Sequence, residues 1–358
     1  MIEIQNRKTD NKHIMDIRYL EQDENDRSRQ LYETAFPEDS MEFVDYYYSE
    51  KCKDNEILVM EDEDGIVSMI HLNPYTISMH GEDAKVHYVV AVATDENHRM
   101  EGHMRSLMEQ AFYDLYQAGE PFAFLTPANP DYYYSCGFEY WDNQIALQQD
   151  QDTIWNGRQR LVAAVPADCD KMAQFSNETL AGQFDLFVKK DGAYYERLIK
   201  EQECDGGHLI VIKEVPEAFK DCSEEERLDA ECVGGIFSMN HGAGLYFREP
   251  ILAHSCTEEV VPTMMGRILN LKRFCQMQKS EEVIDLKVRI RDTMLSENEG
   301  CYHIFIDKNG GQITAIDESE LDVLLSADED AKEDGSMDIA ELGQLLFNKM
   351  RIYINEVV

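Results

Sequence analysis

One stretch of the chain, YVVAVATDENHRMEGHMRSLMEQ from Tyr88 to Gln110, limits the possible folds more than any other. An apolar β-branched run passes through a polar turn with a single glycine into a helical pattern, so a strand meets a helix almost directly. Such a helix start directs unpaired N–H groups and the positive end of the helix dipole at one point, which favours an anion. Gly102 lets the backbone approach a phosphate, and Arg99 and Arg105 could donate charge-assisted hydrogen bonds to a pyrophosphate. The stretch therefore predicts a mixed α/β unit with an anion-binding junction.

Patterns on both sides of this junction divide the chain into three units. Residues 1–148 are expected to form one strand, two helices, an antiparallel meander and then strand, helix, strand and helix. Residues 149–262 have a helix–helix–strand–strand order that looks like the opening half of the first unit, without a counterpart of residues 92–105. Residues 263–358 mix strands and helices as an α+β module does. The elements expected in the first unit are strands at 14–20, 57–60, 66–78, 86–94 and 122–125 and helices at 22–36, 40–51 and 102–118.

The charge balance narrows the class of partner. Among 358 residues, 71 Asp and Glu face 33 Lys and Arg, and the formal net charge of −38 repels nucleic acid and anionic lipid over most of the surface. We therefore expect neither nucleic acid nor a membrane as a partner and favour a small cationic amine as the substrate, although surplus acid also serves solubility alone. The nine cysteines form no CxxC pair, the first residues form no apolar signal segment, and no run is long enough to span a membrane. A reducing cytoplasm is the expected location.

Residues Val92–Gly102, VATDENHRMEG, match without a gap the V-A-T-x-x-x-x-R-x-x-G signature of the GNAT acetyltransferases, which the chain resembles. In that family the strand bulges and splays, and its backbone pairs with the pantetheine arm of acetyl-CoA. Two departures from the family are Met104, where Gly or Ala is usual, and the acidic residues of the turn. The resemblance implies acetyl-CoA as co-substrate, and the positions it implies for binding are Val92, Ala93, Thr94, Arg99, Met100, Glu101, Gly102, His103, Met104, Arg105, Ala128 and Asn129.

A second segment supports this resemblance. Residues 132–138, YYYSCGF, are similar to the family's F-Y-x-x-x-G-F segment, in which the tyrosine that matches Tyr133 protonates the leaving thiolate of CoA. An aromatic core cluster is the alternative role. Cys136 is a poor candidate for a nucleophile, since no histidine is paired with it in the sequence.

The whole length resembles the Eis-like acetyltransferases, which join a GNAT domain, a degenerate second GNAT domain and a domain with the sterol-carrier-protein fold. The residues that carry this are the two segments above, AYYERLIKE at 193–201, GGH at 206–208 and MMGRILNLKRF at 264–274. The resemblance implies direct N-acetyl transfer to an aminoglycoside, a polyamine or a lysine side chain, and assembly as a hexamer. It also implies that the terminal carboxylate of Val358 is the general base and that Phe36, on the helices that roof the acceptor site, lines this site unless it belongs to the core. Glu356 could attract a cationic amine or be solvated. A terminal edge strand without a catalytic role is the alternative for Val358.

Two other functions remain as alternatives. The third unit could carry a lipid or sterol, or the chain could bind acyl-CoA without catalysis. Residues 330–341 nearly fit a calcium-binding loop, but Lys332 occupies a ligand place and supplies no oxygen. We therefore expect no metal and interpret the segment as an acidic loop before a capped helix.

Overall fold

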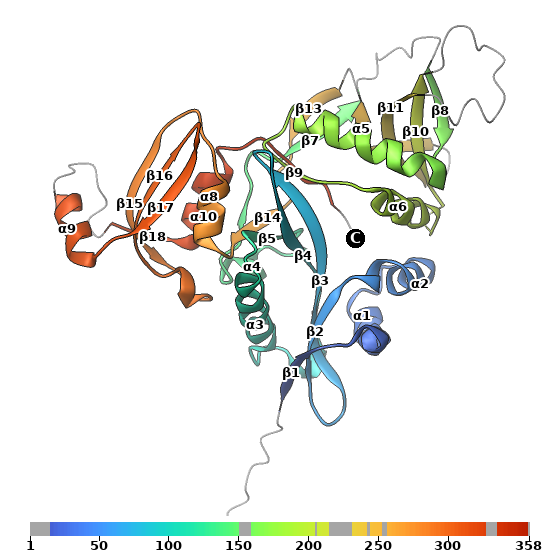
Figure 1. The fold of residues 1–358 in the computed structure, drawn as a ribbon. Helices are drawn as coiled ribbons and strands as arrows, with labels where there is room; N and C mark the ends of the chain where they lie inside the picture. Colours follow the sequence, from blue (N-terminus) through green and yellow to red (C-terminus); the bar gives the residue numbers. More distant parts are fainter. Residues whose placement is uncertain are drawn as a thin grey trace, which may run out of the picture.

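The structure, a computed structural model, describes residues 15–149, 159–204, 206–214, 231–241, 244–252, 256–326 and 335–356. Three groups of strands and helices are visible in Figure 1, and they follow one another in the chain from blue through green to red. The mixed α/β architecture with a C-terminal α+β module confirms the fold class expected from the sequence. In the described part of the chain, no helix combines the length and apolar character needed to cross a membrane.

The central sheet has nine strands. Its main path runs in the order β1-β2-β3-β4-β5-β14-β6, while β9 pairs with β3 and β19 pairs with β9. The strands are β1 (Asp16–Tyr19), β2 (Glu56–Glu61), β3 (Ile66–Met79), β4 (Glu82–Thr94), β5 (Phe122–Leu125), β6 (Glu139–Tyr140), β9 (Leu186–Val188), β14 (Met265–Ile268) and β19 (Ile352–Tyr353).

Helices cover both faces of this sheet (Figure 1). Alternate residues of β2 point to opposite faces, so Ile57 and Val59 pack with helices α1 and α2, whereas Leu58 and Met60 pack with α3. The helical segments of this region are η1 (Gln22–Ser28), α1 (Arg29–Ala35), α2 (Met41–Ser49), η2 (Lys51–Lys53), η3 (Glu96–His98), α3 (His103–Gln117) and α4 (Asp131–Tyr134). The helices expected at 22–36, 40–51 and 102–118 are confirmed within one or two residues at most ends, the first of them beginning as a 3-10 helix.

The hairpin of β3 and β4 is longer than the sequence pattern suggests. Its turn consists of His80 and Gly81 alone, which both have positive φ angles of 51° and 83°. Two such residues match the right-handed twist of paired strands. The pairing therefore continues to Met79 and Glu82, and β4 starts before Val86, the expected first residue.

The second group is an antiparallel sheet in the order β12-β11-β10-β8, covered by helices α5 and α6. A strand, two helices and an antiparallel meander follow one another here, which is also the order at the start of the chain. A separate pair joins β7 to β13. The elements are β7 (Ile145–Gln149), β8 (Gln159–Ala163), η4 (Pro166–Asp168), α5 (Cys169–Ala181), α6 (Gly192–Cys204), β10 (His208–Glu214), β11 (Glu231–His241), β12 (Gly244–Leu252) and β13 (Cys256–Val260).

The third group is a sheet in the order β17-β16-β15-β18, with helices α8, α9 and α10. Its elements are α8 (Leu271–Met277), β15 (Ile284–Arg291), η6 (Ser296–Asn298), β16 (Gly300–Asp307), β17 (Gly310–Ala315), α9 (Glu318–Ser326), β18 (Ser336–Asp338) and α10 (Ile339–Phe347). Of the calcium-loop candidate, residues 330–334 lie outside the described residues. Asp338 and Glu341 form the capping box at the start of α10, as the alternative interpretation expected.

The first and third groups share one hydrophobic core, whereas the second group has a core cluster of its own. Strand β14 lies between β5 and β6 of the central sheet, and one buried cluster includes Phe122 of β5, Phe274 of α8 and Phe347 of α10. The rings of Phe274 and Phe347 both lie edge-on to that of Phe122, with centroids 6.1 and 5.4 Å away. The central sheet therefore crosses the expected boundaries at residues 148 and 262.

Candidate functional site

Strand β4 bulges and separates from β5 just before the predicted junction. Register pairs His71 with Val90 and Met69 with Ala93, so one residue of β3 faces two residues of β4. Ala91 occupies this bulge with a φ of 49°, an uncommon angle for a residue with a side chain. The pairing of β4 with β5 covers His87 and Tyr88 alone, and among the described strands β4 has no partner on that side beyond Tyr88. The bulge and splay expected at this point are confirmed, and the edge of β4 is available to a ligand.

The start of helix α3 has no side-chain cap. Gly102 is the N-cap residue, with a φ of 87°, and a Cβ added to it would meet no atom within 4 Å. The space beside Gly102 is therefore open at a helix start whose N–H groups no side chain caps, as an anion cradle requires. Asp95 caps the short helix η3 through the N–H of Asn97, which fixes the turn before this cradle. The fully exposed Met100 has a positive φ of 66°.

The predicted cofactor residues of the turn are brought together, but their side chains differ in what they contact. Arg99 donates weakly to the carbonyl of Thr94 at 3.4 Å. Arg105 pairs with Glu109 at 2.8 Å and donates to the carbonyl of Thr293 at 3.2 Å, so its guanidinium is already engaged. Val92 and Met104 are partly buried against the core.

His98, Glu101 and His103 form a cluster in the same turn. One ligand atom from each lies within 4.8 Å of the others, a set that could hold a cation. The hydrogen bond of 3.1 Å between His103 Nε2 and Glu101 accounts for two of the three. The cluster was not expected from the sequence, because the ligands belong to a segment interpreted as a phosphate turn.

The second predicted segment lies beside the splay. Asn129 accepts the N–H of Asp131 and so begins the short helix α4, while Ala128 is exposed in the same loop. Tyr133 on α4 is 9% exposed, and its ring packs edge-on against Phe138 at 6.1 Å. Burial raises the pKa of Tyr133 to about 12, and the neighbouring Tyr88 phenol adds to the effect. The phenol is therefore protonated at neutral pH and able to donate.

Cys136, on the turn after Tyr133, is a buried thiol whose pKa is raised by burial. A protonated, buried thiol is a poor nucleophile, which agrees with the interpretation of Cys136 from the sequence. The carbonyl of the same residue accepts a hydrogen bond of 2.7 Å from Arg267 Nε. The turn that carries Tyr133 is thereby fixed to β14.

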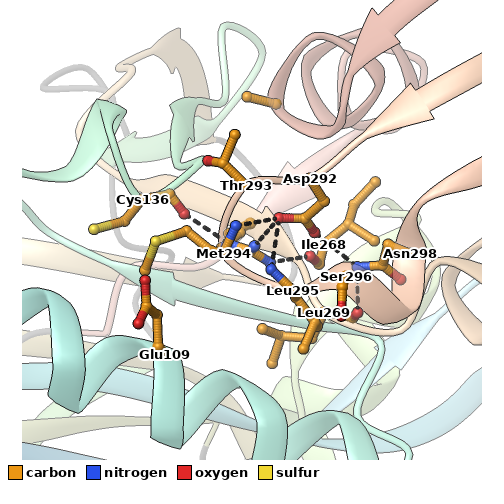
Figure 2. Close-up of polar contacts among 12 residues, drawn as sticks. Glu109, Cys136, Ile268, Leu269, Asp292, Thr293, Met294, Leu295, Ser296 and Asn298 are labelled. Atoms are coloured by element: carbon orange, nitrogen blue, oxygen red, sulfur yellow. Dashed lines mark hydrogen bonds and ion pairs between the residues drawn. The ribbon is translucent and has the colours of Figure 1, made fainter.

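Arg267 is the centre of a buried network that joins the first and third groups. Figure 2 shows the carbonyl of Cys136 on one side of this network and the carboxylate of Asp292 on the other. The guanidinium donates to Asp292 at 2.6 Å and lies 4.4 Å above the ring of Phe112 on α3. Asp292 in turn accepts from the N–H groups of Met294 and Leu295. Because all these groups are satisfied, the buried pair holds its position without an uncompensated charge.

A polar pocket lies on the side of α2 and α6. It is lined by residues of 51–55, of 73–75 on β3, of α6 between Tyr194 and Gln202, and of 355–356, and we call this set the polar pocket. Asn73 stands in register with Tyr88, the last residue at which β4 pairs with β5. The pocket therefore adjoins the point where the two strands separate.

Buried carboxylates occupy one part of the polar pocket. Glu356 is 5% exposed, accepts a hydrogen bond of 2.9 Å from the Tyr194 phenol, and lies 3.6 Å from the ammonium of Lys190. Glu201 accepts from the Tyr46 phenol at 3.1 Å. The charges of Glu356 and Glu201 add to the effect of burial, which raises the pKa of the Tyr75 phenol. Both acids therefore act on the same phenol.

Tyr88 connects the polar pocket with Tyr133. Burial raises the pKa of Tyr88, and the charges of Lys51 and Glu356 act on the same phenol. Tyr88 also adds to the effect of burial that raises the pKa of Tyr133. The ring of Tyr88 stacks on Phe124 at 5.2 Å, which holds it at the separation of β4 and β5.

Two predicted substrate residues have different surroundings. Glu356 lines the polar pocket, whereas Phe36 packs on Tyr32 at 4.8 Å and is not among the residues that line it. Val358 lies outside the described residues. Its role stays a prediction.

Several residues of the polar pocket were not predicted from the sequence. Asn73 interrupts the apolar pattern of β3, and the spacing of Tyr194, Arg197 and Glu201 places the three on one side of α6. These two signals could have indicated polar surfaces. They could not show that the two surfaces face one pocket with Lys51, because that depends on the packing of remote segments.

The chain matches two family models: residues 16–141 match an acetyltransferase (GNAT) domain, and residues 266–353 match a sterol carrier protein domain. The structure is similar to a GCN5-related N-acetyltransferase from Anabaena variabilis, with a TM-score of 0.69, 13% identity, and coverage of 93% of this chain and 90% of that chain. For a GCN5-related N-acetyltransferase from Kribbella flavida these values are 0.69, 11%, 97% and 99%. For Eis1 from Mycobacterium abscessus they are 0.65, 12%, 93% and 89%. No curated protein matches the sequence.

Proposed function

From the premise that the chain carries a GNAT acetyltransferase domain followed by a sterol carrier protein domain, we propose that it transfers the acetyl group of acetyl-CoA to a primary amine bound in the polar pocket. The observation that carries the proposal is the separation of β4 from β5 beside the uncapped start of α3. This place is flanked by the Tyr133 phenol and adjoins the polar pocket. A donor and an acceptor can therefore meet there.

The residues present fit acetyl-CoA. The N–H groups at Gly102, His103 and Met104 suit the diphosphate, and the open space above Gly102 leaves room for it. The free edge of β4 suits the amide groups of a pantetheine arm. When bound, acetyl-CoA supplies the acetyl thioester.

The chain's own groups then handle the protons and the charge. A base removes one proton from the acceptor ammonium, and the resulting amine attacks the thioester carbonyl. A backbone N–H of β4, with that of Val92 as the proposed donor, stabilises the charge on the carbonyl oxygen. Tyr133 protonates the leaving sulfur and becomes a phenolate. The nitrogen loses its second proton to this phenolate as the amide forms, which restores the Tyr133 phenol. No covalent acyl-enzyme is needed.

The base is a carboxylate in this proposal. His71 lies opposite Val90 in the sheet, but burial lowers its pKa to about 3, so it binds a proton poorly. The predicted base is the terminal carboxylate of Val358, and Glu356 in the polar pocket supports this by its place in the chain. The acids of the pocket attract and orient the ammonium.

The test is turnover of acetyl-CoA by the full chain with an aminoglycoside, spermidine or a lysine-containing peptide, with free CoA and acetylated amine both measured. We expect acetylated product with at least one class. A chain that neither turns over nor binds millimolar acetyl-CoA in calorimetry would instead be a non-catalytic scaffold.

The base is tested by adding a few residues after Val358. We expect kcat to fall while acetyl-CoA binding is unchanged, and the same residues added before Met1 serve as the control. Unchanged turnover in the extended chain would remove the terminal carboxylate from the mechanism. Assembly as a hexamer stays a prediction that light scattering would test.

A further inference from the structure

We propose that the polar pocket is built for a zwitterionic acceptor, whose reacting amine is accompanied by a carboxylate, as in an amino acid. The inference rests on the proposed function for the site of the amine. It goes beyond that function by adding the carboxylate of the substrate, because a simple amine needs only the acids of the pocket.

The first observation is an ammonium that has no counter-ion within the described ranges of the chain. Lys51 lines the polar pocket and is half-buried, and its Nζ donates to the Tyr75 phenol at 3.2 Å. Among the residues that the structure describes, no carboxylate lies within ion-pair distance of Lys51. By contrast, Lys53 pairs with Glu50 at 2.7 Å, as expected in a chain with a formal net charge of −38. Because carboxylates are in excess in this chain, a Lys51 ammonium without a nearby carboxylate indicates a binding site for an anion.

The second observation is a set of buried amides without partners. Asn73 is 2% exposed and lines the pocket, and neither its Oδ1 nor its Nδ2 has a hydrogen-bond partner among the described residues. Gln202 is equally buried and lines the same pocket, and its Oε1 has no partner in the part of the chain that the structure describes. Burying such groups without a partner destabilises the folded chain, so a bound molecule is expected to satisfy them. Asn73 offers a donor NH2 group and an acceptor oxygen whichever way its amide is turned.

The third observation is that groups of both charges line one pocket. Lys51 contacts the Tyr75 phenol directly, whereas Glu356 and Glu201 accept hydrogen bonds from two other phenols, those of Tyr194 and Tyr46. The pocket therefore offers a positive group and two carboxylates at different phenols. An ammonium fits beside the acids, and a carboxylate fits beside Lys51 with the Asn73 amide as a second donor.

This arrangement discriminates against a polycation. A polyamine would place a positive group near Lys51 and would leave the donors of the pocket without acceptors. A zwitterion satisfies the groups of both charges, and it enters despite the repulsion that the acidic surface imposes on anions, since its net charge is zero.

The test compares the proteinogenic L-amino acids with their carboxamides and with spermidine. Turnover of acetyl-CoA is measured in the full chain, and binding is measured separately by calorimetry in the presence of CoA. We expect at least one amino acid to bind about tenfold or more tightly than its carboxamide. In Lys51→Met we expect this preference to disappear, with a higher KM and a kcat changed much less.

Lys53→Met is the matched control, since Lys53 lies two positions away, is exposed and does not line the pocket. We expect it to keep the preference. Equal binding of acid and carboxamide, tighter binding of spermidine, or a preference that survives in Lys51→Met would overturn the inference. Amines acetylated without a carboxylate preference would leave the proposed function intact, whereas Lys51-dependent binding of amino acids without acetylation would leave the zwitterion pocket intact and remove the proposed function.

Discussion

The two sides of the proposed reaction site are built in opposite ways. The donor side is one continuous stretch, in which β4 bulges, a short turn follows and α3 begins at Gly102. The polar pocket is assembled from four segments that range from Lys51 to Glu356. A continuous stretch fixes its geometry by local rules of strands, turns and caps, whereas the pocket exists only when distant segments have packed. Changes at the two sides should therefore differ in kind, and the following experiments measure that difference.

The largest expected effect concerns the link between the two sides. In Arg267→Met the carboxylate of Asp292 stays buried without its partner, and the carbonyl of Cys136 loses its donor. We expect the free energy of unfolding to fall by about 3–5 kcal/mol, measured by chemical denaturation. Arg273→Met removes an exposed ion pair with Glu82 and should change it by less than about 1 kcal/mol. Equal losses in both variants would show that the buried network does not hold the turn of Tyr133.

The second effect is on chemistry alone. Tyr133→Phe removes the proposed proton donor but keeps the ring against Phe138. We expect kcat to fall by about 100-fold or more, with KM for acetyl-CoA and stability little changed. Tyr132→Phe, at an exposed neighbour, is the control and should behave as the native chain does. Because the pKa of Tyr133 is raised to about 12, its phenol stays protonated as pH rises from about 8 to about 10, and kcat should not decline there on its account.

A smaller effect is expected at the helix start. Gly102 and Gly119 have nearly equal φ angles of 87° and 81° at opposite ends of α3, and neither has an atom within 4 Å of an added Cβ. Alanine at either position should cost about 1 kcal/mol of stability through backbone strain. Only Gly102→Ala should also raise KM for acetyl-CoA, by about tenfold. A similar KM change in Gly119→Ala would mean that strain, rather than the anion cradle, is responsible.

The smallest effect separates the two arginines of the turn. Arg105 already pairs with Glu109 and Thr293, whereas Arg99 has one long hydrogen bond to Thr94. Arg99→Met should therefore raise KM for acetyl-CoA about three- to fivefold, as an exposed charge contact permits, and Arg105→Met should raise it less. The reverse order in steady-state kinetics would show that Arg105 leaves Glu109 to bind the cofactor.

The same contrast explains what the sequence could and could not predict. The β4–α3 junction was predictable because a β-branched run, a glycine and a helical period follow one another directly in the sequence. The strand alternation of β2 likewise separates Ile57 from Leu58 onto two faces without further information.

Long-range pairing was not predictable in this way. Residues 265–268 are a short apolar run without an evident period, so their position as β14 between β5 and β6 could not be assigned. Arg267 is as informative an example, since a single arginine in a sequence does not indicate burial beside Asp292. For the same reason Lys51 and Asn73 were not connected with Glu356 before the structure brought them to one pocket.

The place of β14 also has a consequence for the order in which the protein can mature. A ribosome releases β5 and β6 long before it synthesises the strand that separates them. Until then the nascent central sheet has a gap, and the edges that flank it are open to wrong partners, which makes this interval the one in which a chaperone has most to protect.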